Sequence, residues 1–371
     1  MQKMNTIKNL DMFRGIAALM VLLFHFYTFY SKELLKISEC FSILSIGHIG
    51  VDLFFVLSGF LITLSLWNSK NFSHFFLKRV KRIAPLAIGT TLVFWGIQNN
   101  IVNFSEISFY SFADLFSHLF FINGFFLEFY STINPVTWSI SIEMAFYLLL
   151  PIVWIVFAKK NMKKFFTVFS VLVFLSFLYR VFLFYYFQEN PEIDSHLKII
   201  YSEQLWGRLD QFFIGIILAY LYTKNNIKNT FKTQLQSIIS TKTVLYSSVI
   251  ALCISSYLFF EYQSDFRNVF LLQVFLHTLT ALGCAGIIYA FVEASDESFL
   301  KNNIITKTLA WFGKISYGVY IFHFAVISLV YKKFEMLNNF GVSLWLQFLL
   351  ILCITTILSY LSYHYFEKRF L

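Results

Sequence analysis

Long apolar runs constrain this chain most, because about 20 consecutive apolar residues suffice for a helix to cross a membrane. Ten segments have this character: 10–30, 47–67, 83–101, 138–157, 165–187, 206–223, 244–260, 269–292, 310–330 and 342–364. The chain is 58% hydrophobic and only 13% charged, with a mean hydropathy of +0.67, which excludes an ordinary soluble domain. We therefore predict an all-α polytopic membrane protein with about ten transmembrane helices.

The distribution of Lys and Arg predicts the orientation of these helices. If the N-terminus is cytoplasmic, the inner segments hold 19 of the 29 Lys and Arg residues and the outer segments hold 6. Cytoplasmic loops of membrane proteins carry such an excess. Both termini are therefore expected in the cytoplasm, and the net charge of +9 needs no nucleic-acid partner.

The segment 102–137 is long for a connection, yet its apolar stretch is short and interrupted. An eleventh span there would reverse the orientation of everything after it, so we expect a re-entrant or interfacial element on the outer side. The chain has no fixed repeat and no linker rich in Pro and Ser. Residues 1–371 are therefore expected to form one membrane domain.

The cysteines are scattered singly along the chain, without a CxxC pair or a cluster of Cys and His. They are expected to pack as small apolar side chains, so neither a disulfide framework nor a metal site is predicted.

Arg14 and His25 lie eleven residues apart inside the first apolar segment. On a helix this spacing leaves the two side chains roughly 20° apart on one face, with about 16 Å of rise between them. An arginine inside a membrane is costly and usually functional, so the pair predicts a functional site. The alternative is an arginine that reaches the inner interface and a histidine that binds a neighbouring carbonyl.

Asp52 lies just inside the second apolar segment, in the run GVDLFFVLSGF that begins at Gly50. A carboxylate there needs a cationic or hydrogen-bonding partner. His25 is expected at a closer depth than Arg14. Gly47, Gly50 and Gly59 also favour close approach of helices, so tight packing is the alternative function of this run.

Arg79 and Arg82 precede the third apolar segment at its inner end. Three residues apart on a helix, they face the same way and would form a fork for phosphate oxygens. The alternative is a basic cluster that serves only orientation.

Ser139, Glu143 and Tyr147 recur every four residues in the fourth apolar segment and form a polar stripe on one helical face. Glu143 is expected at about the depth of His25, in the outer half of the membrane.

Two further groups of polar residues lie in apolar segments. Tyr320 and His323 are neighbours in the ninth segment, which predicts a second imidazole in the outer half of the membrane. Arg208 and Asp210 begin the sixth segment and point to different faces of their helix. For these two, anchoring at the interface is as reasonable as a catalytic role.

Together these motifs resemble bacterial membrane-bound acyltransferase family 3, the O-acetyltransferases of lipopolysaccharide O-antigen, peptidoglycan and other exported glycans. The matching features follow the family's order over almost the whole chain. They are Arg14-x10-His25, GVDLFFVLSGF at 50–60, Arg79-x-x-Arg82, TWSISIEMAFYLLLP at 137–151, RLDQFFIGI at 208–216 and ISYGVYIFH at 315–323.

The resemblance implies a ten-helix enzyme of the bacterial inner membrane that moves an acyl group, usually acetyl from cytosolic acetyl-CoA, to a glycan or lipid-linked glycan. It implies that Arg79 and Arg82 bind CoA phosphates, that Arg14 guides the donor and that His25 is the catalytic centre. An imidazole would serve as general base or as a covalent acyl carrier, and both remain open. Glu143 or Asp52 would orient it.

Many members of the family carry an additional extracytoplasmic esterase-like domain, which this sequence lacks. A step that needs such a domain would then require a partner protein. Association with a second copy of the chain or with a glycan-assembly protein is also left open. Another class remains open: a transporter or flippase would use the same buried Arg, His, Asp and Glu for proton coupling. A third alternative is a non-catalytic partner of a glycan synthase, in which loss of His25 would have no effect.

Overall fold

The structure is a computed structural model that describes residues 10–69, 71–99, 108–155, 162–227, 240–262, 265–293, 303–333 and 343–370. Within these ranges the regular elements are all helical, as predicted. Several basic residues used to predict the orientation, among them Lys3, Lys8, Lys159 and Lys160, lie outside the described residues.

The helices form two compact units. Unit 1 comprises Met1–Leu10, Val51–Phe75 and Ala145–Lys307, and unit 2 comprises Asp11–Gly50, Phe76–Met144 and Thr308–Leu371. Each unit combines segments that are distant in sequence, and each is described separately below.

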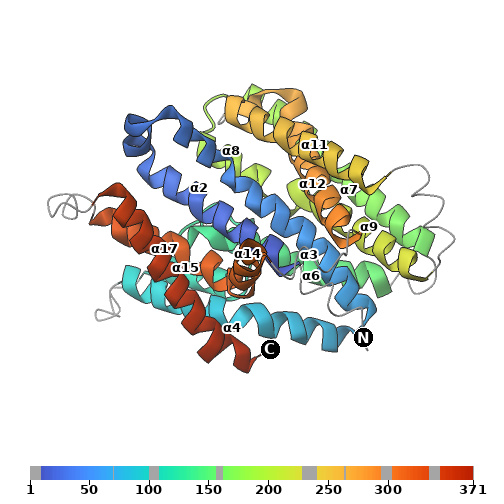
Figure 1. Ribbon diagram of the computed structural model, residues 1–371, viewed down its shortest axis with the longest axis horizontal. Coiled ribbons are helices and arrows are strands. Elements are labelled where there is room, and N and C mark those ends of the chain that lie inside the picture. Colours follow the sequence, from blue (N-terminus) through green and yellow to red (C-terminus); the bar gives the residue numbers. More distant parts are fainter. Residues whose placement is uncertain are drawn as a thin grey trace. The chain divides into compact units, whose positions relative to one another are not determined.

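Unit 1 contains most of α3 (Ile49–Trp67), together with α7, α8, α9, α11, η7 and α12. The bounds of the latter are α7 Met162–Glu189, α8 Ser195–Ser202, α9 Leu205–Ile227, α11 Thr241–Tyr262, η7 Asp265–Asn268 and α12 Phe270–Glu293. The helices α11 and α12 pack side by side, and α12 also packs against α7 and α9 (Figure 1).

Glycines bring α3 and α9 into backbone contact within unit 1. A Cβ atom added to Gly59 would lie 2.2 Å from the carbonyl oxygen of Phe212, and one added to Gly215 would lie 2.3 Å from that of Val56. Because neither position has room for a side chain, the close approach expected at Gly59 is present. It brings the polar first turn of α9 toward the start of α3.

Unit 2 contains α2, most of α4, and the helices α5, α15 and α17, with shorter pieces between them. The bounds of these elements are α2 Asp11–Ile37, η2 Glu39–His48, α4 Phe72–Gln98, α5 Phe109–Leu119, η4 Asn123–Phe125, η5 Pro135–Thr137, α6 Trp138–Val153, α14 Ile304–Lys314, α15 Ser316–Lys332, α17 Leu344–Leu361, η8 Ser362–Phe366 and η9 Glu367–Arg369. Of α6, unit 2 holds the first seven residues. The helix α15 packs against both α2 and α17 (Figure 1).

In the described part of the chain, eight helices are long and apolar enough to cross a membrane, or nine if one bent pair counts as a span. Nine of the ten predicted segments coincide with these. The tenth, 206–223, forms α9, whose Arg208, Asp210 and Gln211 lower its hydropathy. The short α5, with 11 residues, falls within 102–137 and is too short to cross, in agreement with the absence of an eleventh span.

The predicted span 310–330 corresponds to two helices with a bend between them. It is divided into α14 and α15, which meet at an angle of 76°. The break coincides with a long-range contact: Gly313 packs directly on the backbone of Asp11, where an added Cβ would lie 1.7 Å from the carbonyl oxygen. The hydroxyl of Ser316 then donates to the carbonyl of Gly313 and satisfies an acceptor at the end of α14.

Candidate functional site

Two histidines face each other in unit 2. Nδ1 of His25, on α2, lies 3.0 Å from Nε2 of His323, on α15, and the ring centroids are 5.0 Å apart. His323 is fully buried, whereas His25 is half-buried. The sequence predicted each imidazole separately, and the structure brings them into contact across 298 positions of chain.

A hydrogen-bonded group next to the pair fixes the start of α6 to α15. The hydroxyl oxygens of Ser139 and Tyr320 lie 2.6 Å apart, and the Tyr320 hydroxyl also donates to the carbonyl of Val136. Asn134 donates its amide to the carbonyl of Ile321, 3.1 Å away. These bonds hold the turn of α15 that immediately precedes His323, so Ser139 and Tyr320 belong to the surroundings of the pair.

Three arginines share the other end of unit 2. Arg14 forms an ion pair with Asp11 at 3.0 Å and experiences the positive charges of both Arg79 and Arg82. Arg79 is buried and Arg82 half-buried. Arg14 precedes His25 by eleven residues on α2, which corresponds to about 16 Å of helix. The structure thus brings together the two arginine motifs that the sequence treated separately.

Glu143 lies near Tyr317, whose hydroxyl donates to the carbonyl of Ile83 at 2.7 Å. Tyr317 precedes His323 by six residues, or about 9 Å of helix. Since Gly313 contacts Asp11 while His323 contacts His25, α15 runs parallel to α2 and Tyr317 lies toward the arginines. The sequence predicted Glu143 at about the depth of His25, and the structure places it near Tyr317. In the described residues, the hydrogen bonds of the His25 ring go to Val21 and His323.

Asp52 belongs to unit 1 and takes part in a buried ion network there. Its Oδ1 accepts hydrogen bonds from Arg208 at 2.9 Å, from Gln211 at 2.6 Å and from His277 at 3.0 Å. From the sequence, His25 was expected closer to Asp52 than Arg14 is. Within its own unit, the carboxylate is instead surrounded by donors from α9 and α12.

Arg208 also donates to Glu203, which pairs in turn with Arg267 at 3.8 Å. Burial opposes ionisation of the Glu203 carboxyl, but the positive charges of Arg208 and Arg267, together with His277, lower its pKa below the usual value. Glu203 and Arg267 were not singled out from the sequence because they lie in connections between apolar segments, where charges are ordinary.

Asp210 pairs with Arg180 of α7 at 2.6 Å, on a different face of α9 from Arg208. The predicted difference in direction between Arg208 and Asp210 is therefore present. Both residues are buried, which does not fit anchoring at a membrane interface. Tyr147 is also buried in this unit. Arg180 and His277 were not predicted as site residues. They stand in the sequence as polar residues within apolar segments, which is the signal that could have identified them.

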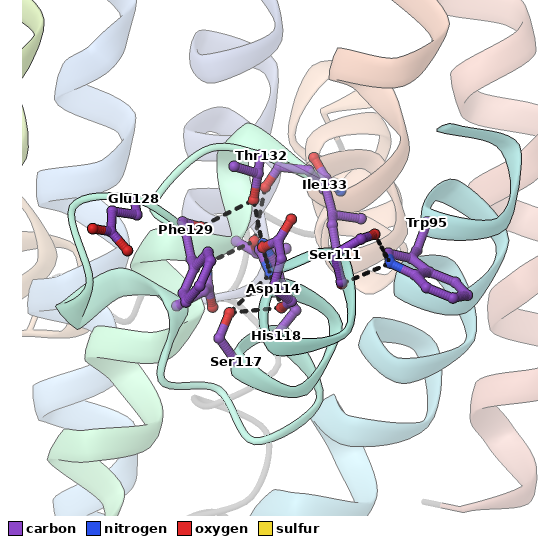
Figure 2. A network of polar contacts seen from close by, with 12 residues as sticks. Trp95, Ser111, Asp114, Ser117, His118, Glu128, Phe129, Thr132 and Ile133 are labelled. Carbon is purple, nitrogen blue, oxygen red and sulfur yellow. Dashed lines mark hydrogen bonds and ion pairs between the residues drawn. The ribbon is translucent and has the colours of Figure 1, made fainter. Parts of the chain in front are cut away.

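A further polar cluster holds the segment that follows α4 (Figure 2). Nδ1 of His118 lies 3.2 Å from the carboxylate of Asp114 and 3.3 Å from the hydroxyl of Ser117, and Thr132 donates to the same carboxylate. A Ser-His-Asp triad uses opposite nitrogens of the imidazole for Ser and Asp. Since both contacts here involve one nitrogen, the cluster lacks the arrangement of a hydrolase triad and instead connects α5 to the loop before α6.

Comparison with known proteins gives an independent result. The family described as an acyltransferase domain matches residues 7–364. No solved structure matches the chain.

The relatives include a putative peptidoglycan O-acetyltransferase, YrhL, of Bacillus subtilis strain 168, which is 27% identical over 87% of this chain and 50% of its own length. The peptidoglycan O-acetyltransferase OatA of Listeria monocytogenes EGD-e is 24% identical over 97% of this chain and 55% of its own length. A putative O-acetyltransferase of Staphylococcus aureus strain COL, SACOL0978, is 24% identical over the whole chain and 58% of its own length.

The chain thus spans about half the length of the curated relatives it matches. The match covers the two histidines, the three arginines and both units. This protein is therefore a multi-pass membrane protein that belongs to acyltransferase family 3.

Proposed function

We propose that this protein transfers an acetyl group from cytosolic acetyl-CoA to a hydroxyl group of a cell-surface glycan, in the bacterial cytoplasmic membrane with both termini inside. The observation that carries this proposal is the arrangement within unit 2. Among the described residues, Nε2 of His25 makes no hydrogen bond. Arg14 lies about 16 Å away on the same helix and is close to Arg79 and Arg82 of α4.

Arg79 and Arg82 are proposed to bind the phosphates of CoA, with Arg14 further along the path of the donor. Guanidinium groups bind phosphate oxygens in bidentate fashion, and an excess of positive charge in one place favours a polyanionic ligand. Asp11 pairs with Arg14 at 3.0 Å. The long pantetheine arm of CoA would then extend along α2 toward His25.

His25 is proposed as general base. Its Nε2 would remove the proton of a glycan hydroxyl while the oxygen attacks the thioester carbonyl. The new C–O bond forms, the C–S bond breaks, and the proton finally reaches the CoA thiolate to give free CoA. In the alternative mode, Nε2 itself takes the acetyl group and passes it to the glycan. Glu143, near Tyr317, is proposed to line the path between the arginines and the histidines.

The role of Asp52 as orienting acid stays a prediction. Its contacts with Arg208, Gln211 and His277 support a structural function in unit 1 instead. For Arg208 and Asp210, the same ion pairs favour structural support over a direct catalytic role.

The acceptor is proposed to be a glycan because the relatives are named as O-acetyltransferases, two of them of peptidoglycan. Lipopolysaccharide O-antigen and other exported polysaccharides are alternative acceptors of the same chemistry.

The test is transfer of radiolabel from acetyl-CoA to surface glycan, in cells that express wild-type protein, His25→Ala or Thr28→Ala at equal membrane abundance. Thr28 is exposed on the same helix and serves as control, because its hydroxyl only binds the carbonyl of Phe24. Label is expected with wild type and Thr28→Ala and absent with His25→Ala. Equal label with His25→Ala would contradict the proposal and favour a non-catalytic partner of a glycan synthase. No label with wild type would contradict it and favour the transporter.

A further inference from the structure

We propose that His323 is the positioning partner of His25: it receives the Nδ1 proton of His25 while the Nε2 atom of His25 performs the chemistry. This inference rests on the proposed function, since it assigns a role within the same site. In Ser-His-Asp enzymes a carboxylate occupies the corresponding place. From the sequence, Glu143 or Asp52 was predicted for that role.

Backbone carbonyls determine where the protons lie on the two rings. Nδ1 of His323 is 2.9 Å from the carbonyl oxygen of Val319, and Nδ1 of His25 is 3.1 Å from that of Val21. A carbonyl oxygen only accepts, so both Nδ1 atoms carry hydrogen. In neutral His323, Nε2 then has a lone pair, and it faces the Nδ1–H of His25 at 3.0 Å.

The position of this proton also identifies Nε2 as the reactive atom of His25. With its proton on Nδ1, neutral His25 keeps a lone pair on Nε2. The two hydrogen bonds of this ring among the described residues both use Nδ1, which leaves Nε2 available for a substrate hydroxyl or for the thioester carbon. His25 is thus the base next to the substrate, and His323 lies behind it as the proton acceptor.

The proton transfer balances without a further reactant. When Nε2 of His25 takes the hydroxyl proton, its Nδ1 proton moves to Nε2 of His323, so the positive charge is shared between two rings. When the CoA thiolate leaves, the proton returns by the reverse route and ends on sulfur. If Nε2 is acylated instead, the same shift to His323 leaves a neutral acyl-imidazole.

The apolar surroundings of the pair explain why an imidazole suits this place. The rings of Phe24 and Phe324 have centroids 5.0 and 5.2 Å from that of His25, and the ring of Tyr320 lies 5.8 Å from His323. His323 is 0% exposed. A permanently charged carboxylate would be expensive among these groups, whereas an imidazole is neutral at rest and charged only during the reaction.

The test compares His323→Gln, His323→Ala and the control His118→Gln with wild-type protein in the acetyl-transfer assay. Glutamine retains an acceptor for the Nδ1–H of His25 but does not take its proton. We expect a loss of about 10- to 100-fold in His323→Gln, the range typical of groups that orient a metal-ligating histidine through a hydrogen bond. His118 is an equally buried histidine outside the pair, and its variant should retain transfer.

Rescue of acetyl transfer by free imidazole distinguishes a proton acceptor at position 323 from a side chain that only packs. Free imidazole should partly restore transfer in His323→Ala, where the side chain leaves space, and not in His323→Gln. The double variant His25→Ala/His323→Ala, treated with imidazole, shows any direct reaction of imidazole with the donor. In ¹⁵N-histidine spectra of wild-type protein, the signal lost in His25→Ala should have the shifts of the Nδ1–H tautomer.

Wild-type rates in His323→Gln, or an Nε2–H tautomer for His25, would overturn the inference while the proposed function stands. Loss of transfer in His323→Ala without rescue, combined with full activity of His323→Gln, would also overturn it and indicate a packing role. Absence of transfer in wild-type protein would instead overturn the proposed function itself.

Discussion

The hydroxyl oxygens of Ser139 and Tyr320 lie 2.6 Å apart although 181 residues separate them in the chain. This contact connects the start of α6 to the turn of α15 that carries His323. Each hydroxyl also has the carbonyl of Val136 within hydrogen-bonding distance, at 3.2 and 3.1 Å. The position of the second histidine thus depends on a residue from a different helix.

Because each hydroxyl keeps the Val136 carbonyl when its partner is removed, Ser139→Ala and Tyr320→Phe should each cost only about 1 kcal/mol of stability. The double variant should cost less than the sum of the two, since one shared hydrogen bond is lost once. Thermal unfolding of the four proteins in detergent measures this difference. Strict additivity would show that the contact contributes no coupling energy.

Arg79→Gln and Arg82→Gln should raise the KM for acetyl-CoA about 10-fold or more, while kcat changes less. The reason is the loss of one charge-assisted contact to phosphate in the ground state and the transition state alike. Initial rates against acetyl-CoA concentration separate the two parameters. Lys78→Gln, on the same helix and exposed, is the control. A fall in kcat alone would contradict donor binding by these arginines.

Arg208→Met should destabilise the protein more than Asp52→Asn. Removal of Arg208 leaves the carboxylates of Asp52 and Glu203 without their shared cation, a change that typically costs about 3–5 kcal/mol. In Asp52→Asn, Arg208 retains Glu203, and the amide oxygen still accepts from Gln211, so a cost of about 1–3 kcal/mol is expected. The melting temperatures of the two variants test this expectation. A melting temperature of Asp52→Asn equal to that of wild type would instead favour a purely catalytic role for Asp52.

Gly313→Ala should prevent normal packing, whereas Gly89→Ala should be tolerated. A Cβ at position 313 would lie 1.7 Å from the backbone oxygen of Asp11, and one at position 89 would have nothing within 4 Å. Alanine in the interior of a helix is favoured over glycine by about 1 kcal/mol, so Gly89→Ala should be neutral or stabilising. Membrane abundance and melting temperature test the pair, and equal behaviour of the two would contradict the close contact.

The helical class and most of the spans could be predicted because each depends on a local property, the length of an apolar run. The division of 310–330 into α14 and α15 could not, because it depends on the contact of Gly313 with Asp11, 302 residues away in sequence. Similarly, the sequence left interfacial anchoring and a catalytic role equally open for Arg208 and Asp210, and their buried partners on α3 and α7 are known only from the structure.

By itself the sequence determined which residues are polar within an apolar chain, and thereby the candidates His25, Arg14, Arg79, Arg82 and His323. Periodicity along one helix shows which residues share a face, but it carries no information about what that face meets. Only the tertiary structure decided that His25 meets His323, that the three arginines gather in one place, and that Asp52 is paired within unit 1. The physical reason is that these contacts join helices far apart in sequence, whose packing is decided by side-chain and backbone fit along their whole length.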